Sequence, residues 1–114
     1  MTPEQAALIE RLRSLLAAEP TMREVSMFGG RSIMVNEKMV VAAQRDGALL
    51  VRIAAERHDA LLAEPGAAQA EMGAGRDMGP GWIEVEASTI AGDDRLAFWI
   101  AAAMEHHRAM TDSL

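Results

Sequence analysis

The sequence predicts an α+β domain in which one antiparallel β-sheet, arranged as a meander, carries an N-terminal and a C-terminal helix packed on it. Apolar residues recur at helical spacing near both ends of the chain, and short extended runs lie between them. The first four of these runs are separated by only two to five residues, which leaves no room for the crossover that parallel neighbours require. With 114 residues and no Cys, residues 1–114 fit a single domain that needs no disulfide.

The first element is a helix predicted over residues 3–18. Thr2 is suited to cap it, Pro3 fits the first helical position, and Gln5 can reach back as in a capping box. An apolar stripe marks one face and comprises Leu8, Ile9, Leu12, Leu15 and Leu16. The polar face lacks the basic character of a membrane-surface helix, so we expect the stripe to pack on the domain's own core.

Short strands and tight reversals fill the middle of the chain. Strands are predicted over residues 23–28, 32–35, 39–43, 48–53, 69–72 and 82–86. Asn36-Glu37-Lys38 and Arg45-Asp46-Gly47 are typical of tight turns, and a helix is predicted over residues 54–63. The glycines of residues 66–81 indicate an exposed loop. Alternation over residues 82–86 puts Trp82 and Val85 on different faces unless the strand is bulged, and the sequence leaves that choice open.

The last element is a helix predicted over residues 94–109, capped by Asp93 or Asp94. Its apolar stripe comprises Leu96, Trp99, Ile100, Ala103, Met104 and His107. Four methionines are predicted to fill the core of this aromatic-poor chain: Met27, Met34, Met39 and Met104. Met72 and Met78 offer the alternative of an adaptable binding surface in the loop.

Charge is unevenly distributed along the chain. Residues 1–57 carry eight basic and seven acidic side chains, whereas residues 58–114 carry three basic and ten acidic ones. A uniformly acidic half repels phosphate backbones, so we expect no direct nucleic-acid binding. The N-terminus has no targeting signal and no apolar run is long enough to span a bilayer, so we expect a cytoplasmic protein without membrane contact.

Motifs for catalysis, metals and cofactors are not found. Zero Cys removes thiolate chemistry, and adjacent His106 and His107 lie about 100° apart on a helix, not in the spacing that chelates a metal. The loop glycines match neither a Rossmann nor a Walker pattern, and no Ser lies in a nucleophile elbow. Glu84 and Glu86 share a strand face, which favours an ordinary solvated pair. We therefore expect no catalytic residue, metal or cofactor, and no enzymatic activity.

An ordered set of short motifs resembles a known family. Met27-Phe28-Gly29-Gly30 is followed by Met39, Leu50-Val51-Arg52, Gly66-Ala67, Arg76-Asp77-Met78, Trp82-Ile83-Glu84-Val85, Asp93-Asp94, Leu96 and Trp99. This order and spacing resembles the TfoX/Sxy N-terminal domain family over residues 5–108. The resemblance implies helices against a curved antiparallel sheet, similar to secretion-chaperone-like folds.

The resemblance also implies a regulatory context. Full-length members carry a C-terminal helical domain and regulate natural competence with a cyclic-AMP receptor-type transcription factor. This chain ends at Leu114, so we expect a stand-alone N-terminal domain, for which competence regulation itself is an open expectation. The family often has aromatics after Met39 and near Gln69, where this chain has Val40 and alanines. The family supplies no established catalytic residues.

Six residues form the candidate interaction or ligand groove: Phe28, Gly29, Gly30, Arg31, Arg52 and Trp82. Phe28 is alternatively a core anchor beside glycines that permit positive φ, and Arg52 alternatively forms an ion pair with Glu56, four residues on. We expect a non-enzymatic module that binds a protein partner and forms a homodimer. The alternative is a small-molecule-binding protein or minor enzyme with its pocket near the Met-Phe-Gly-Gly motif.

Overall fold

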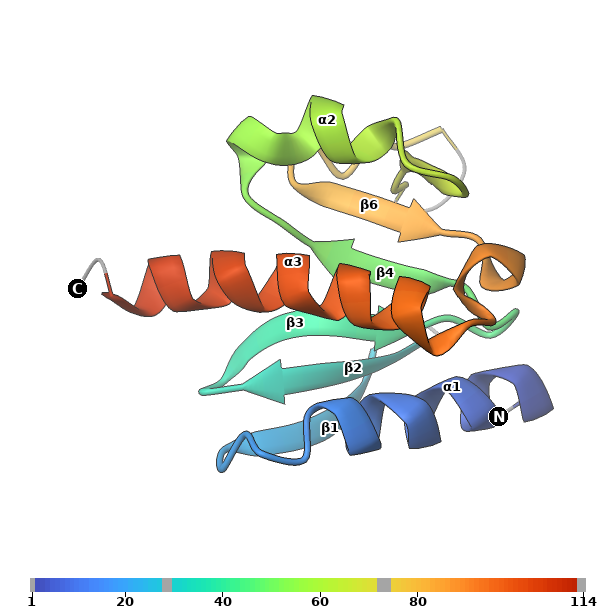
Figure 1. Ribbon diagram of the computed structural model, residues 1–114, viewed down its shortest axis with the longest axis vertical. Coiled ribbons are helices and arrows are strands. Elements are labelled where there is room, and N and C mark those ends of the chain that lie inside the picture. Colours follow the sequence, from blue (N-terminus) through green and yellow to red (C-terminus); the bar gives the residue numbers. More distant parts are fainter. Residues whose placement is uncertain (1, 28–29, 72–74, 113–114) are drawn as a thin grey trace.

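The computed structural model describes residues 2–27, 30–71 and 75–112 (Figure 1). The element order is α1 (Pro3–Leu15), β1 (Met22–Met27), β2 (Gly30–Val35), β3 (Lys38–Ala43), β4 (Leu49–Arg52), a 3₁₀ turn η1 (Ala55–Arg57), α2 (His58–Leu62), β5 (Ala67–Gln69), β6 (Trp82–Val85), a 3₁₀ turn η2 (Ala87–Ile90) and α3 (Asp93–Asp112). The predicted order of helices and strands is confirmed.

The six strands form one antiparallel sheet in the order β1-β2-β3-β4-β6-β5. Strands β1 to β4 are the predicted meander. The chain then passes through η1 and α2 to the far edge, where β5 forms, and β6 returns between β5 and β4. This arrangement is the α+β fold that the sequence predicts.

Local sequence sets the two tight turns of the meander. Asn36 and Glu37 both have positive φ, 52° and 64°, which is the backbone of the two-residue turn that matches strand twist. The β3–β4 turn uses Gly47 at φ +86°, where a side chain would be strained. Asp46 tightens this turn because its carboxylate accepts a hydrogen bond from the Ala48 amide at 3.0 Å.

Helix α1 begins at the predicted residue, but it ends earlier than predicted. The Thr2 hydroxyl accepts the Gln5 amide hydrogen bond at 3.1 Å, which confirms the cap. The Gln5 side chain does not close a capping box. It is buried and donates to the Ala43 carbonyl at 2.9 Å, which ties α1 to β3. The helix ends at Leu15, which is 43% exposed, so the prediction of an inward Leu15 is wrong.

One face of the sheet holds the hydrophobic core. Helices α1 and α3 lie across this face (Figure 1), and Leu61 brings α2 into the same cluster at the β5–β6 end. Trp99 is fully buried at the centre, where its ring meets Phe98 edge-on at 5.3 Å. The predicted α3 stripe is confirmed, because every member is buried: Leu96, Trp99, Ile100, Ala103, Met104 and His107.

The methionine prediction is only partly right. Met104 is buried in the core, but Met34 and Met39 are half-buried and pair across β2 and β3, outside the core cluster. A bulge between Ile33 and Met34 shifts the register so that Val40 and Val41 are both buried. Strand β5 lies at Ala67–Gln69 and not at residues 69–72. Within the described ranges, no helix has the length and apolarity to cross a membrane.

Candidate functional site

Four of the six predicted groove residues are described, and they lie in two separate places. Phe28 and Gly29 lie outside the described residues. Gly30 begins β2 and faces the end of β1, and Arg31 follows it opposite Ala43. Arg31 contacts the Glu24 carboxylate at 3.9 Å, and Glu24 also pairs with Arg13 of α1, so Arg31 belongs to an ion-pair group at the α1 edge.

Arg52 and Trp82 meet at the other end of the strands. They are Cα partners in the β4–β6 pairing, and the Arg52 guanidinium lies 5.4 Å from the centroid of the Trp82 ring. This distance is that of a cation–π contact. Among the described ion pairs none joins Arg52 to Glu56, so Trp82 takes the place of the predicted carboxylate partner. The register therefore brings Arg52 to Trp82 and keeps this pair away from Gly30 and Arg31.

The strand register also defines an outer face, the side of the sheet away from the core cluster. One row crosses all six strands on this side and comprises Val25, Ser32, Ala42, Leu50, Glu84 and Ala68. The residues next to them along the strands point to the core, as Ile33, Val41 and Ile83 show by full burial. Trp82 alternates with Ile83 and so joins the outer face, whereas Val85 is buried, which settles the open question.

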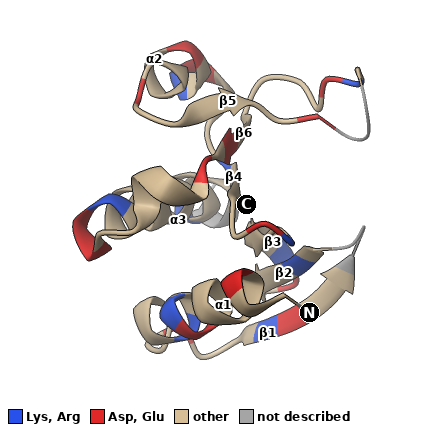
Figure 2. Ribbon diagram, turned by 90° about the vertical axis from the view of Figure 1, so that its right-hand side faces the viewer, with Lys and Arg blue, Asp and Glu red and all other residues tan. Residues whose placement is uncertain are grey.

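Half-buried apolar side chains occupy the outer face. Val25 and Leu50 are half-buried, and neither belongs to the core cluster nor packs against it. In the part of the chain that the structure describes, all three helices contribute their apolar residues to the opposite side. Figure 2 shows α1 and α3 together on one side of the strands. The outer face thus carries apolar surface that no described helix covers.

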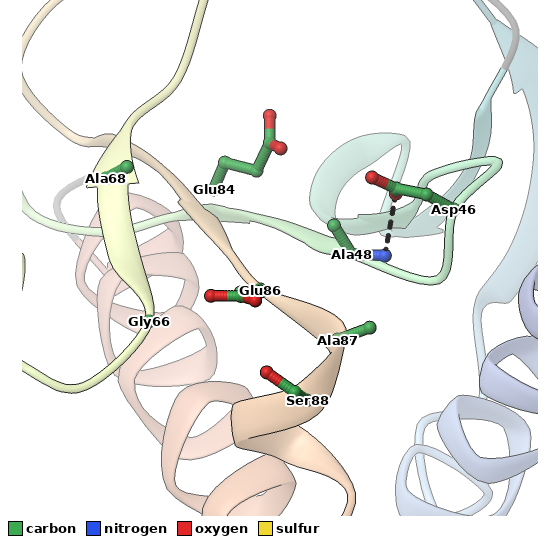
Figure 3. Close-up of a pocket in the computed structure, with 8 residues that line it drawn as sticks. All are labelled: Asp46, Ala48, Gly66, Ala68, Glu84, Glu86, Ala87 and Ser88. Carbon is green, nitrogen blue, oxygen red and sulfur yellow. Dashed lines mark hydrogen bonds between the residues drawn. The ribbon is translucent and has the colours of Figure 1, made fainter.

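A cavity of about 470 Å³ opens at the β4–β6–β5 end of this face (Figure 3). Three carboxylates line it, from Asp46 in the β3–β4 turn and from Glu84 and Glu86 at the end of β6. Small residues make up the rest of the wall: Ala48, Gly66, Ala68, Ala87 and Ser88. Asp46 and Glu84 approach the space from opposite sides.

The carboxylates of this cavity bring negative charges close to one another. Burial raises the pKa of Glu84, and the nearby Asp46 and Glu71 carboxylates raise it further. None of the ion pairs between described residues includes Asp46, Glu84 or Glu86. Elsewhere on the surface, seven acidic residues are paired with arginine: Glu10, Glu19, Glu24, Glu37, Glu64, Asp93 and Glu105.

Sequence reasoning missed this cavity. The interpretation of Glu84 and Glu86 as a solvated pair did not include Asp46, which the sequence assigned to turn formation. The pairing of β6 with β4 brings the two segments together, and that pairing follows from the return of the chain between β4 and β5. No local signal joins residues 82–86 to the turn at Asp46, because the two segments lie far apart in the sequence. None of the four predicted groove residues that the structure describes lines this cavity.

The three histidines have separate surroundings. His58 is buried, and its Nδ1 accepts the Gly81 amide hydrogen bond at 2.9 Å, which fixes the start of β6 against α2. Burial lowers the pKa of His106 and of His107 on α3. Among the residues that the structure describes, no group of three or more His, Asp or Glu side chains is arranged to hold a metal ion.

Comparison with known families finds a match over most of the chain. The model of the TfoX N-terminal domain matches residues 14–107 of this chain. That span includes every strand, α2 and most of α3. No curated protein matches the chain.

Proposed function

The chain belongs to the TfoX N-terminal domain family, a competence-regulator-like domain, and we propose that it acts by binding another protein rather than by catalysis. The observation that supports this most is the outer face, where Val25 and Leu50 are half-buried and no described helix packs. Val25 on β1 and Leu50 on β4 are separated by the buried Ser32 and Ala42, and apolar positions on an uncovered sheet face are suited to contact with another protein.

Charge supports a protein partner over a nucleic acid. The net charge is −6, and the second half of the chain holds ten of the 17 acidic residues. The cavity on the outer face adds three carboxylates without ion-pair partners among the described residues. Phosphate backbones are repelled by such a surface. Retention of DNA in a gel at physiological salt would contradict this part of the proposal.

We also propose that the protein is a homodimer and that it is located in the cytoplasm. Light scattering then gives a mass of about two chains of 12.3 kDa. A mass equal to one chain rejects the homodimer without affecting the proposal of a protein partner.

The test is affinity capture from the native cell with three forms of the chain. Leu50→Arg places a charge in the centre of the outer face, and Ala101→Arg makes the same kind of change on the exposed side of α3. Circular dichroism melts confirm that both variants fold. We expect a defined partner with the wild type and with Ala101→Arg, and its loss with Leu50→Arg.

Two results would refute the proposal. A partner retained equally by all three forms shows that the outer face is not the interaction surface. A thermal-shift screen that finds a stabilising metabolite, together with no captured protein, favours the alternative of a small-molecule-binding protein or minor enzyme.

A further inference from the structure

Three carboxylates gather at the outer-face cavity, which concentrates negative charge in one place. Of the eight described ion pairs, none reaches Asp46, Glu84 or Glu86, although Arg11, Arg13 and Arg95 each find a carboxylate elsewhere. Asp46 uses one oxygen to accept the Ala48 amide, and that bond leaves its charge in place. The cavity thus concentrates negative charge that the described part of the fold does not neutralise.

The shape of the cavity suits a long side chain. Its volume of about 470 Å³ exceeds what a single guanidinium group or ammonium group with its stem requires. The space exists because alanines occupy the wall positions where larger residues would fill it, at Ala48, Ala68 and Ala87. Gly66 also lines the space, and its φ of +77° lets the backbone pack closely on Thr89, where a Cβ would lie 2.1 Å from Thr89 Oγ1.

An apolar contact adjoins the charged space. Leu50 is the direct cross-strand partner of Glu84, and Ala42 is the partner of Leu50 on its other side. A segment lying across β4 and β6 therefore meets a carboxylate and a leucine one strand apart. Strands in a sheet are about 4.8 Å apart. Alternate side chains of one extended segment point to the same side, about 7 Å from each other, and can reach both positions.

We propose that the outer face binds a basic and apolar segment of a partner protein, which inserts an arginine or lysine side chain between Asp46 and Glu84 and packs an apolar side chain on Leu50. This inference rests on the proposed function and names the chemistry of the partner. Arginine fits best, because its planar guanidinium donates to two carboxylates at once. Entry of the cation neutralises negative charge that has no ion-pair partner among the described residues, so binding is favoured by electrostatic complementarity.

The first experiment uses a matched pair of peptides as probes. One is acetyl-Leu-Ser-Arg-Ser-Leu-amide, in which the arginine and both leucines point to the same side of an extended segment. The other carries citrulline in place of arginine, which keeps the shape and removes the charge. Each is titrated into the ¹⁵N-labelled chain and followed by NMR. We expect the arginine peptide to shift the amide signals of Ala48, Ala68 and Ser88, and the citrulline peptide to bind at least about tenfold more weakly.

The second experiment removes the charge from the protein. The cavity variant combines Asp46→Asn, Glu84→Gln and Glu86→Gln. The control variant combines Glu4→Gln, Glu56→Gln and Asp94→Asn, three exposed residues that lie outside the cavity and in no described ion pair. We expect the cavity variant to lose at least about tenfold in affinity for the arginine peptide, and the control to stay within about twofold. Both variants should retain the wild-type melting behaviour.

The outcomes separate this inference from the proposed function. Equal binding of the two peptides would refute the proposal that the outer face binds a basic segment. Amide signal shifts confined to α1 and α3 would refute it as well. A captured partner can stay bound to the cavity variant and yet be lost with Leu50→Arg. In that case the proposed function stands, and the proposal that a basic side chain of the partner enters the cavity is refuted. If the cavity variant loses the partner and the control variant retains it, both the proposed function and the binding of a basic segment in the cavity are supported.

Discussion

Replacing Gly81 with alanine should be among the most destabilising glycine substitutions in the described fold. Gly81 has φ +94°, a conformation that costs an alanine about 1–2 kcal/mol relative to glycine. Its added Cβ would lie 2.8 Å from the Ile53 carbonyl oxygen, which is backbone and cannot rotate away. The chain must therefore move apart at the point where β6 begins.

That movement disrupts two hydrogen bonds. The Ile53 amide donates to the Gly81 carbonyl at 2.8 Å, and the Gly81 amide donates to His58 Nδ1 at 2.9 Å. Each contributes about 1 kcal/mol net, so the total loss in the free energy of unfolding is about 3–4 kcal/mol. Gly79→Ala is the matched control, because Gly79 has nearly the same φ of +92° and nothing within 4 Å of the added Cβ. The control should lose only the backbone cost of about 1–2 kcal/mol.

Urea unfolding followed by tryptophan fluorescence measures both variants, since Trp99 is fully buried and becomes exposed on unfolding. The predicted difference between the two variants is about 2 kcal/mol. If Gly81→Ala and Gly79→Ala lose the same stability, the close approach at Ile53 and the His58 contact do not anchor β6, and that inference is refuted.

Three further perturbations follow from the packing and the titrating groups. Leu96→Ala should lose about 2–5 kcal/mol because Leu96 is fully buried, whereas Leu15→Ala, at a residue 43% exposed, should lose less than about 1 kcal/mol; similar urea midpoints would contradict the assigned core. Gln5→Ala should lose about 1–3 kcal/mol in the same assay, since it leaves the buried Ala43 carbonyl without its side-chain donor, and an unchanged midpoint would show that this bond does not hold α1 on the sheet. Burial lowers the pKa of His107 in the folded chain below its ordinary value of 6.5, so the unfolded chain takes up the proton first, and stability present above pH 6.5 is lost as the pH falls through that value toward the lower folded pKa. His107→Leu should make the free energy of unfolding less dependent on pH in this window, and an unchanged slope would assign that dependence to other groups.

The element order was predictable because its signals are local. The stripe from Leu96 to His107 has helical spacing, and Asn36 with Gly47 marks turns whose backbone few other residues adopt. Both are confirmed. The errors concern where side chains point: Leu15 follows the apolar stripe, yet the helix ends there and leaves it exposed. Gln5 leaves the cap for a carbonyl on β3, a choice that depends on packing between elements.

The candidate site was harder to predict because it depends on long-range pairing. Arg52 has a carboxylate at helical spacing in Glu56, but the pairing of β4 with β6 offers Trp82 instead. The same pairing brings the turn residue Asp46 to Glu84 and forms the cavity. No local pattern shows that a strand near residue 84 returns beside β4. The register, rather than the residue types, determines which charges meet.

Carboxyl footprinting of the chain with its captured partner tests the outer-face interaction most directly. Carbodiimide labelling of Asp46, Glu84 and Glu86 should fall when the partner is bound, while labelling of the exposed Glu4, Glu56 and Asp94 should stay unchanged. Protection of the three cavity carboxylates alone is the predicted result. Unchanged labelling in the cavity, with protection of Glu4 on α1 or Asp94 on α3, would contradict the assignment of the outer face as the binding surface.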